Sequence, residues 1–467
     1  MTDTQAAERP DGPRAPIYDE EGQLREDFVA EVSDAIEAND AEGVRERLQG
    51  LHEAEQADVL EALNEDERQS MVQLAGESFD YAALTEVDEA IRLDIVENMQ
   101  PGQLAEAVRD LDSDEAVFIL EDMEEDEREQ VLKQIPFQER IRLRRALDYP
   151  EETAGRRMQT EFIAVPPFWT VGQAIDWMRV DDDLPERFSQ IFCIEPTFRL
   201  AGVLPLDVLL RAKRRVVIAD IMEPDAHPIP AEMDQEEAAQ VFERYNLLSA
   251  PVVDENERLV GVLTIDDIVD VIQSEADEDI RRLAGVGDEE LSDRVRDLTR
   301  SRFPWLLINL GTAILASLVI GLFEATLAEM VALAVLMPIV ASMGGNAATQ
   351  TMTVAVRALA TRDLDGFNTR RIVRKELLVG LINGLAFAVL IGIVAAVWFS
   401  NPSLGLVIAI AMVVNMVCAA AAGILIPIAL DRFDADPAIA SGVFVTTVTD
   451  VVGFFAFLGL AALWFGI

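Results

Sequence analysis

The sequence predicts a multidomain membrane protein with an all-α helical-repeat domain, an α/β pair of repeats, a connecting helix and a five-helix transmembrane domain. The net charge is −46, yet half of the 467 residues are apolar. Of 84 acidic and 38 basic residues, 75 and 30 lie in residues 1–300, which leaves 9 and 8 for residues 301–467. Charged and apolar residues therefore occupy different parts of the chain. This excludes one uniform globular domain and disorder throughout, and the negative first part disfavours nucleic acid as a partner.

The first part of the chain begins with a predicted disordered acidic tail, residues 1–28. Residues 29–150 carry Leu, Val and Ala at helical spacing on acidic segments. EAEQADVLEALNEDERQSMVQL and EDEREQVLKQIPFQERIRLRRAL look like loose repeats of helix pairs. This pattern predicts an acidic helical superstructure.

Residues 151–280 contain one pattern twice: two strands, Gly-Val-Leu and an acidic helix start. The copies are FSQIFCIEPTFRLAGVLPLDVLL and LSAPVVDENERLVGVLTIDDIVDVI, and this internal repeat resembles a tandem pair of CBS domains. In CBS domains that bind adenine nucleotides, the hydroxyl and the final Asp of this turn often contact phosphate and ribose. The resemblance therefore implies ATP as a possible ligand, with Thr264 and Asp267 as contacts. The first copy has Pro205 where the hydroxyl would stand.

Residues 281–303 are predicted to form a connecting helix. The Gly-Val-Gly at residues 285–287 offers a hinge, and a helix from Leu291 to Arg302 is expected to run into the membrane.

The last part of the chain, residues 304–467, contains five apolar segments, each long enough to cross a bilayer. They are Pro304–Phe323, Met330–Val356, Leu377–Phe399, Leu404–Leu430 and Ala438–Phe465. Basic residues gather before the first segment and between the second and third, and basic loops remain inside. We therefore expect a multi-pass protein of the inner (plasma) membrane, with a cytoplasmic acidic half and the C-terminus outside.

The fifth segment contains a single charged residue, Asp450, in the stretch FVTTVTDVVGFF. A carboxylate near mid-bilayer costs about 2.5–3.5 kcal/mol on insertion scales, so it must face protein or water. Thr446 and Gly453 share its helical face. Either Asp450 is a structural residue that bonds between helices, or it lines an ion pathway, and we favour the pathway.

The second segment contains MPIVASMGGNAATQT. Pro338 removes a backbone donor, and Gly344 and Gly345 permit either an opened or a tightly packed helix. No basic residue lies deep in any segment, so the available ligands are oxygen atoms, which suit Mg²⁺ or Ca²⁺. With two His and two Cys in the chain, a transition-metal site is disfavoured.

The order of domains, together with PIVASMGGNAATQT, RALATRDLD and TVTDVVGF, resembles the MgtE magnesium channel/transporter family. The resemblance covers roughly residues 30–467. It implies a homodimer with a pore on the two-fold axis, in which Asp450 is the main site for hydrated Mg²⁺. The turn formed by Gly344, Gly345 and Asn346 would line the same pathway. Thr446, which shares the helical face of Asp450, is expected to line it as well.

The resemblance also implies that cytoplasmic acidic residues bind regulatory Mg²⁺ and thereby close the pore. Where the segments match, the implied ligands are Asp267, Asp270, Glu275, Glu278 and Asp279, with Glu232 and Glu236 as weaker matches. The alternative for each is a solvated surface acid.

The predicted function is uptake of Mg²⁺, gated by cytoplasmic Mg²⁺. The transported ion and lipid are the other expected partners. Two alternatives stay open: a transporter of other divalent cations such as Co²⁺, Mn²⁺ or Ca²⁺, and a membrane-anchored Mg²⁺ or nucleotide sensor without transport. An enzyme is disfavoured because the sequence shows no nucleophile with its base and no metal-hydrolase pattern.

Overall fold

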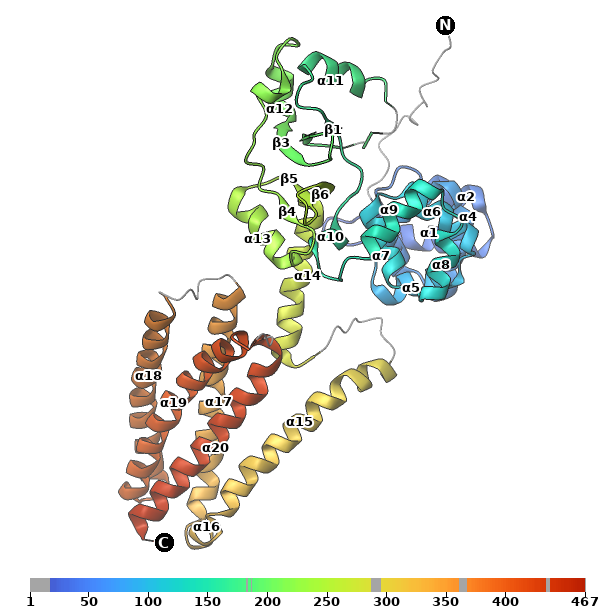
Figure 1. The fold of residues 1–467 in the computed structure, drawn as a ribbon. Coiled ribbons are helices and arrows are strands. Elements are labelled where there is room, and N and C mark those ends of the chain that lie inside the picture. The colour runs from blue at the N-terminus through green and yellow to red at the C-terminus, as the bar shows by residue number, and fades with distance from the viewer. Residues whose placement is uncertain are drawn as a thin grey trace. The chain divides into compact units, whose positions relative to one another are not determined.

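The computed structural model describes residues 17–181, 184–185, 187–286, 295–360, 368–433 and 437–466. The chain divides into two compact units, Met1–Ser274 and Glu275–Ile467, whose elements are labelled in Figure 1. The division lies before residue 300, where the composition of the sequence changes, so the acidic residues 275–300 belong to the second unit.

The first unit begins with short helices, as the helical periodicity predicts. They are α1 (Glu26–Glu37), α2 (Ala41–Leu48), α3 (Glu53–Ala62), α4 (Glu65–Ala75), α5 (Glu89–Asn98), α6 (Pro101–Asp110), α7 (Ser113–Glu121), α8 (Glu125–Leu132) and α9 (Phe137–Leu147), with the 3₁₀ turns η1 (Gly76–Ser78) and η2 (Tyr81–Leu84). Capping boxes begin α3, α4 and α7, pairing His52 with Glu55, Asn64 with Glu67 and Asp112 with Glu115. The acidic first turns therefore both satisfy backbone N–H groups and complement the helix dipoles.

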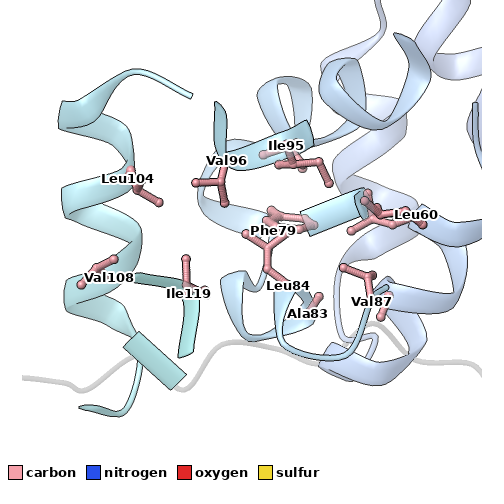
Figure 2. Packing of buried hydrophobic residues seen from close by; sticks show 14 of the residues in the cluster. Leu60, Phe79, Ala83, Leu84, Val87, Ile95, Val96, Leu104, Val108 and Ile119 are labelled. Atoms are coloured by element: carbon pink, nitrogen blue, oxygen red, sulfur yellow. The ribbon is translucent and has the colours of Figure 1, made fainter. Parts of the chain in front are cut away.

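The apolar stripes of these helices form one core. Figure 2 shows part of it, in which Leu84 of η2, Val108 of α6 and Ile119 of α7 contribute to the same cluster. Regular structure begins before residue 28, where the predicted disordered tail ends. Helix α1 starts at Glu26, and Tyr18 forms a β-bridge with Leu24.

The two repeats form two similar three-stranded sheets. The first contains β1 (Ala164–Val165), β2 (Gln190–Ile194) and β3 (Leu200–Pro205), and the second β4 (Ile229–Pro230), β5 (Ser249–Val253) and β6 (Leu259–Thr264). In each sheet the first two strands pair in parallel and the last two pair antiparallel. The register of the antiparallel pair shifts at the equivalent place in both sheets, Cys193/Ile194 and Val252/Val253. The surrounding helices are α10 (Ala154–Arg157), α11 (Val171–Met178), α12 (Leu206–Arg211), η3 (Ile218–Asp220) and α13 (Gln235–Tyr245). The internal repeat is thus present in the backbone.

The connecting segment differs from the predicted boundary at residue 280. Helix α14 (Ile265–Ala284) continues past it without a break. Gly285 then adopts φ +70°, a conformation that favours glycine. Residues 287–294, which include the predicted start of the next helix, lie outside the described residues. From Val295 the chain is helical again.

The second unit contains five helices long and apolar enough to cross a membrane. These are α15 (Val295–Gly321), α17 (Val331–Ala360), α18 (Thr369–Trp398), α19 (Pro402–Asp431) and α20 (Pro437–Phe465), with the short α16 (Glu324–Glu329) after the first. Helix α19 contacts α17, α18 and α20, while α15 contacts α20 (Figure 1). Small residues permit the closest approach: a Cβ on Gly405 would lie 2.5 Å from the Gly392 carbonyl oxygen.

Candidate ion pathway and cytoplasmic acidic site

Asp450 lies on α20 as the sole charged residue of the span Gly442–Phe465. Its side chain is partly buried, and among the described residues it has neither an ion-pair nor a hydrogen-bond partner. The neighbouring hydroxyls are satisfied within the helix, since Thr446 donates to the Gly442 carbonyl at 2.9 Å and Thr449 to the Thr446 carbonyl at 2.9 Å. No helix–helix bond accounts for the carboxylate. This favours the pathway interpretation over the structural one.

The two neighbouring glycines on α17, Gly344 and Gly345, have different surroundings. Helix α17 is continuous through Pro338, so the packed alternative is observed and not the opened one. Gly344 is buried against α19, where an added Cβ would lie 2.2 Å from Asn415 Nδ2, whereas nothing lies within 4 Å of a Cβ on Gly345. Asn346 is exposed, with its Nδ2 3.4 Å from Ser342 Oγ. Gly345 and Asn346 therefore present the accessible face, and Gly344 packs.

Within the first unit, α7 is tied to the segment that leads into the first repeat. The Thr160 N–H donates to Ser113 Oγ at 2.7 Å, and the Ser113 N–H donates to Glu161 at 3.3 Å. At the other end of α7, Glu121 pairs with Arg157 at 3.4 Å. These contacts bring the N-terminal turn of α7 to the first turn of α14.

Two acidic residues meet there. The carboxyl group of Asp114 is buried and faces that of Asp267. Gln159 donates to Asp114 at 3.2 Å, and Thr264 donates its hydroxyl proton to Asp267. Burial raises the pKa of both carboxyls, and the proximity of Asp267 raises that of Asp114 further. Two carboxylates so placed repel unless a proton or a cation lies between them.

Other acids surround this pair. Burial, and then Asp112, Glu53 and Asp80, raise the pKa of Glu115 to about 7. Burial raises the pKa of Glu86 as well, with Asp270 as the next cause. Acids from the helical domain and from the start of α14 therefore share one negative region.

The remaining predicted sensor residues are more dispersed. Glu278 pairs with Arg282 one turn along α14, Glu232 is exposed, and Glu236 lies 3.4 Å from Gln240 Nε2. Glu275 and Asp279 also have interaction partners. Within the described part of the chain, no group of three or more His, Cys, Asp or Glu side chains is arranged to hold a metal ion. The regulatory roles of all seven stay predictions.

The two predicted nucleotide contacts, Thr264 and Asp267, are hydrogen-bonded to each other. A separate cavity of about 420 Å³ lies at the turns of the two hairpins. Its lining combines Phe162 and Phe198 with three arginines, Arg142, Arg145 and Arg258. Arg145 lies 4.0 Å from Asp254, and both are in this lining. The arginines give this cavity positive charge, which the Thr264–Asp267 turn lacks.

Two residues at these sites were missed by the sequence reasoning. Asp114 stands in the first turn of α7 among many similar acids, and nothing in its local sequence separates it from them. Asn415 is the single amide within a strongly apolar stretch of α19, and a buried amide at bilayer depth is a signal that was available.

The fold defines a membrane protein, in which an acidic unit of short helices and two similar sheets precedes five helices long and apolar enough to cross a membrane. Three family models match the chain: the divalent cation transporter MgtE over residues 337–460, the MgtE intracellular N domain over 51–152, and the CBS domain over 218–274. The chain belongs to the MgtE family of divalent cation transporters.

Two relatives carry this assignment. The magnesium transporter MgtE of Enterococcus faecalis is 34% identical over 446 residues, which cover 95% of this chain and 98% of the relative. That of Thermus thermophilus is 36% identical over 318 residues, 68% of this chain and 70% of the relative. A solved structure of the cytosolic domain of the Mg²⁺ channel MgtE in complex with ATP is 25% identical and covers 52% of this chain and 99% of its own, with a TM-score of 0.43.

The raised pKa of Glu115 predicts a pH dependence of stability. Its value in the folded protein, about 7, exceeds the ordinary 4.5, so between these values the folded state binds more protons than the unfolded state. Stability therefore falls as pH rises through this window. In thermal unfolding of the full-length protein without divalent cations, we expect a higher Tm at pH 5 than at pH 7.5.

The variant Glu115→Gln should reduce that difference in Tm. Glu125→Gln, at an exposed position on α8, should keep it. An unchanged pH dependence in Glu115→Gln would contradict the assignment.

Proposed function

We propose that the protein carries Mg²⁺ across the membrane as a homodimer, through a pathway lined by Asp450 of α20 and by Gly345 and Asn346 of α17. The observation that carries the proposal is a lone carboxylate at bilayer depth without a protein partner among the described residues. Mg²⁺ dehydrates reluctantly and is usually held by one or two carboxylates through its waters. Two Asp450 side chains, one from each subunit, would supply two charges without removing the hydration shell.

The proposed orientation places the acidic first unit in the cytoplasm of a cell with an inner membrane and the C-terminus outside. The function is transport, with no chemical conversion of a substrate. Thr446 supports the pathway through its position one turn before Asp450, although its hydroxyl is engaged by backbone carbonyls. Gly344 contributes by packing, as described above.

We further propose that cytoplasmic Mg²⁺ closes the pathway. The acids of the helical domain and of α14 repel each other when the cation is scarce. Mg²⁺ between them removes the repulsion and favours the docked arrangement, in which Asp114 faces Asp267. A ligand that binds one arrangement better shifts the population toward it.

Replacing Asp450 with Asn should reduce Mg²⁺ uptake into proteoliposomes by about tenfold or more, because the charge that attracts the hydrated ion is lost. The amide keeps the shape of the side chain, so insertion and dimer formation should persist. Glu329→Gln, at the end of α16, serves as the control and should transport normally. Normal uptake by the Asp450 variant would remove this residue from the pathway.

The same assay separates the alternatives. A broader divalent transporter would carry Co²⁺, Mn²⁺ or Ca²⁺ in competition with Mg²⁺, and a sensor without transport would show no flux at all. The unpartnered Asp450 favours a transporter over a sensor, since a sensor requires no charge in a span.

Deleting residues 1–280 should produce a transporter that millimolar cytoplasmic Mg²⁺ no longer inhibits, because the facing acids are gone. Flux would be measured with Mg²⁺ varied on the side that corresponds to the cytoplasm. The full-length protein is the control. If the truncated protein retains the same Mg²⁺ inhibition, the sensor lies in the membrane unit instead.

For ATP, we propose binding at the second repeat, where Thr264 and Asp267 begin α14. Thr264→Val should weaken ATP binding to the full-length protein by about tenfold, as expected for the loss of a hydrogen bond to a charged phosphate. Arg258→Ala tests the arginine-lined cavity in the same titration. If Arg258→Ala weakens binding and Thr264→Val does not, the nucleotide occupies the cavity and the proposed contacts are wrong.

A further inference from the structure

Asn415 is the most completely buried amide in the membrane unit. It lies in the middle of α19 with 0% of its surface exposed. An amide at this depth is costly unless its polar atoms are bonded. Its position between α17 and α20 therefore requires an explanation.

The amide touches both helices that carry the proposed pathway. On α17, its Nδ2 donates to the Val340 carbonyl oxygen at 2.8 Å. Val340 stands one turn before Gly344, so the bond holds α17 directly beside the accessible Gly345 and Asn346. The bond is made to a backbone atom, so it fixes the helix itself and not a side chain.

Two glycines make room for this amide, one on each helix. A Cβ on Gly344 would lie 2.2 Å from Asn415 Nδ2, and a Cβ on Gly453 would lie 2.9 Å from the same atom. Any larger residue at either position would displace the amide. Gly453 follows Asp450 by three residues and therefore lies on the same face of α20.

One end of the amide remains unsatisfied. Asn415 Oδ1 is buried without a hydrogen-bond partner among the described residues. Leaving such an atom unbonded costs about 1–3 kcal/mol. An apolar side chain of similar size would avoid this cost, so stability alone does not explain an Asn here.

We propose that Asn415 is a positioning residue that fixes the spacing between the Asp450 carboxylate of α20 and the Gly345–Asn346 face of α17. The inference rests on the proposed pathway. Selectivity between Mg²⁺ and the larger, more readily dehydrated Ca²⁺ depends on the size and rigidity of the site. Without this bond α17 is no longer held to α19 at the amide against which Gly453 of α20 packs. We expect the spacing between α17 and α20 to widen there and the site to admit Ca²⁺.

The experiment compares uptake of Mg²⁺ and Ca²⁺ by the full-length protein in proteoliposomes. Asn415→Leu keeps the approximate volume and removes the bond. We expect the protein to remain monodisperse in detergent and the ratio of Mg²⁺ to Ca²⁺ uptake to fall by about tenfold. An unchanged ratio would overturn the proposal.

A double variant separates positioning from space filling. In Asn415→Ala with Gly453→Ala, the second methyl group refills part of the space that the first change empties. Thermal stability should recover relative to Asn415→Ala alone, while the ratio stays low because the Val340 bond is still missing. If the double variant recovers both the thermal stability and the ratio of Mg²⁺ to Ca²⁺ uptake, Asn415 only fills space and the proposal is wrong. This variant also carries the test if Asn415→Leu fails to fold.

Thr351→Val is the matched control. Thr351 is a buried polar residue of α17 that lies beside Gly423 of α19 and 3.5 Å from Glu376. Loss of its hydroxyl should leave the uptake ratio unchanged. Asp450→Asn is measured in parallel. If it transports normally, Asp450 is not part of the pathway, and the spacing role of Asn415 fails with it. If it loses uptake while Asn415→Leu leaves the ratio unchanged, the pathway stands and only the positioning role of Asn415 fails.

Discussion

The membrane unit depends on one constraint: a polar group at bilayer depth must find a partner, because hydrocarbon supplies none. Asn415 meets the constraint on one side, through the carbonyl of Val340. Asp450 does not meet it within the described chain, although the hydroxyls around it do. The contrast distinguishes a polar residue that joins helices from one that is available to a hydrated ion or to the same residue of a second subunit.

The first unit is governed by the opposite constraint, since its charges are many and of one sign. Most of its acids are exposed and are stabilised by water, by first turns of helices or by arginines, as Glu139 is by Arg109. Asp114 differs because burial denies it water while Asp267 adds a like charge. Burial and a like charge therefore coincide at Asp114 and Asp267, and the net charge of the unit alone does not distinguish these acids from the exposed ones.

The sequence predicted the order of domains, the repeated strand pattern and the five spans, because these follow from periodicity and apolar length. It identified Asp450 for the same reason, as one charge in an apolar segment. It could not predict that Gly344 packs on Asn415 while Gly345 stays open, since neighbouring glycines are alike until the helix rotation is known. Nor could it identify Asp114, whose burial results from contacts made by Ser113 and Glu121 with a distant segment.

Helix α14 bears on how sensing could reach the pathway. Asp267 lies in its first turn, and Leu283 lies in its last, where it packs in a cluster with Val445 of α20 and Ala348 of α17. Val445 precedes Asp450 by five residues on the same helix. An uninterrupted helix changes its length little, so a displacement at its first turn is carried to its last. If Mg²⁺ closes the pathway as proposed, a break in α14 between Asp267 and Leu283 should weaken closure and leave Mg²⁺ binding at the first turn intact. A flexible linker at the predicted boundary of residue 280 would already lack this rigid connection, so the same break would then have no effect on closure.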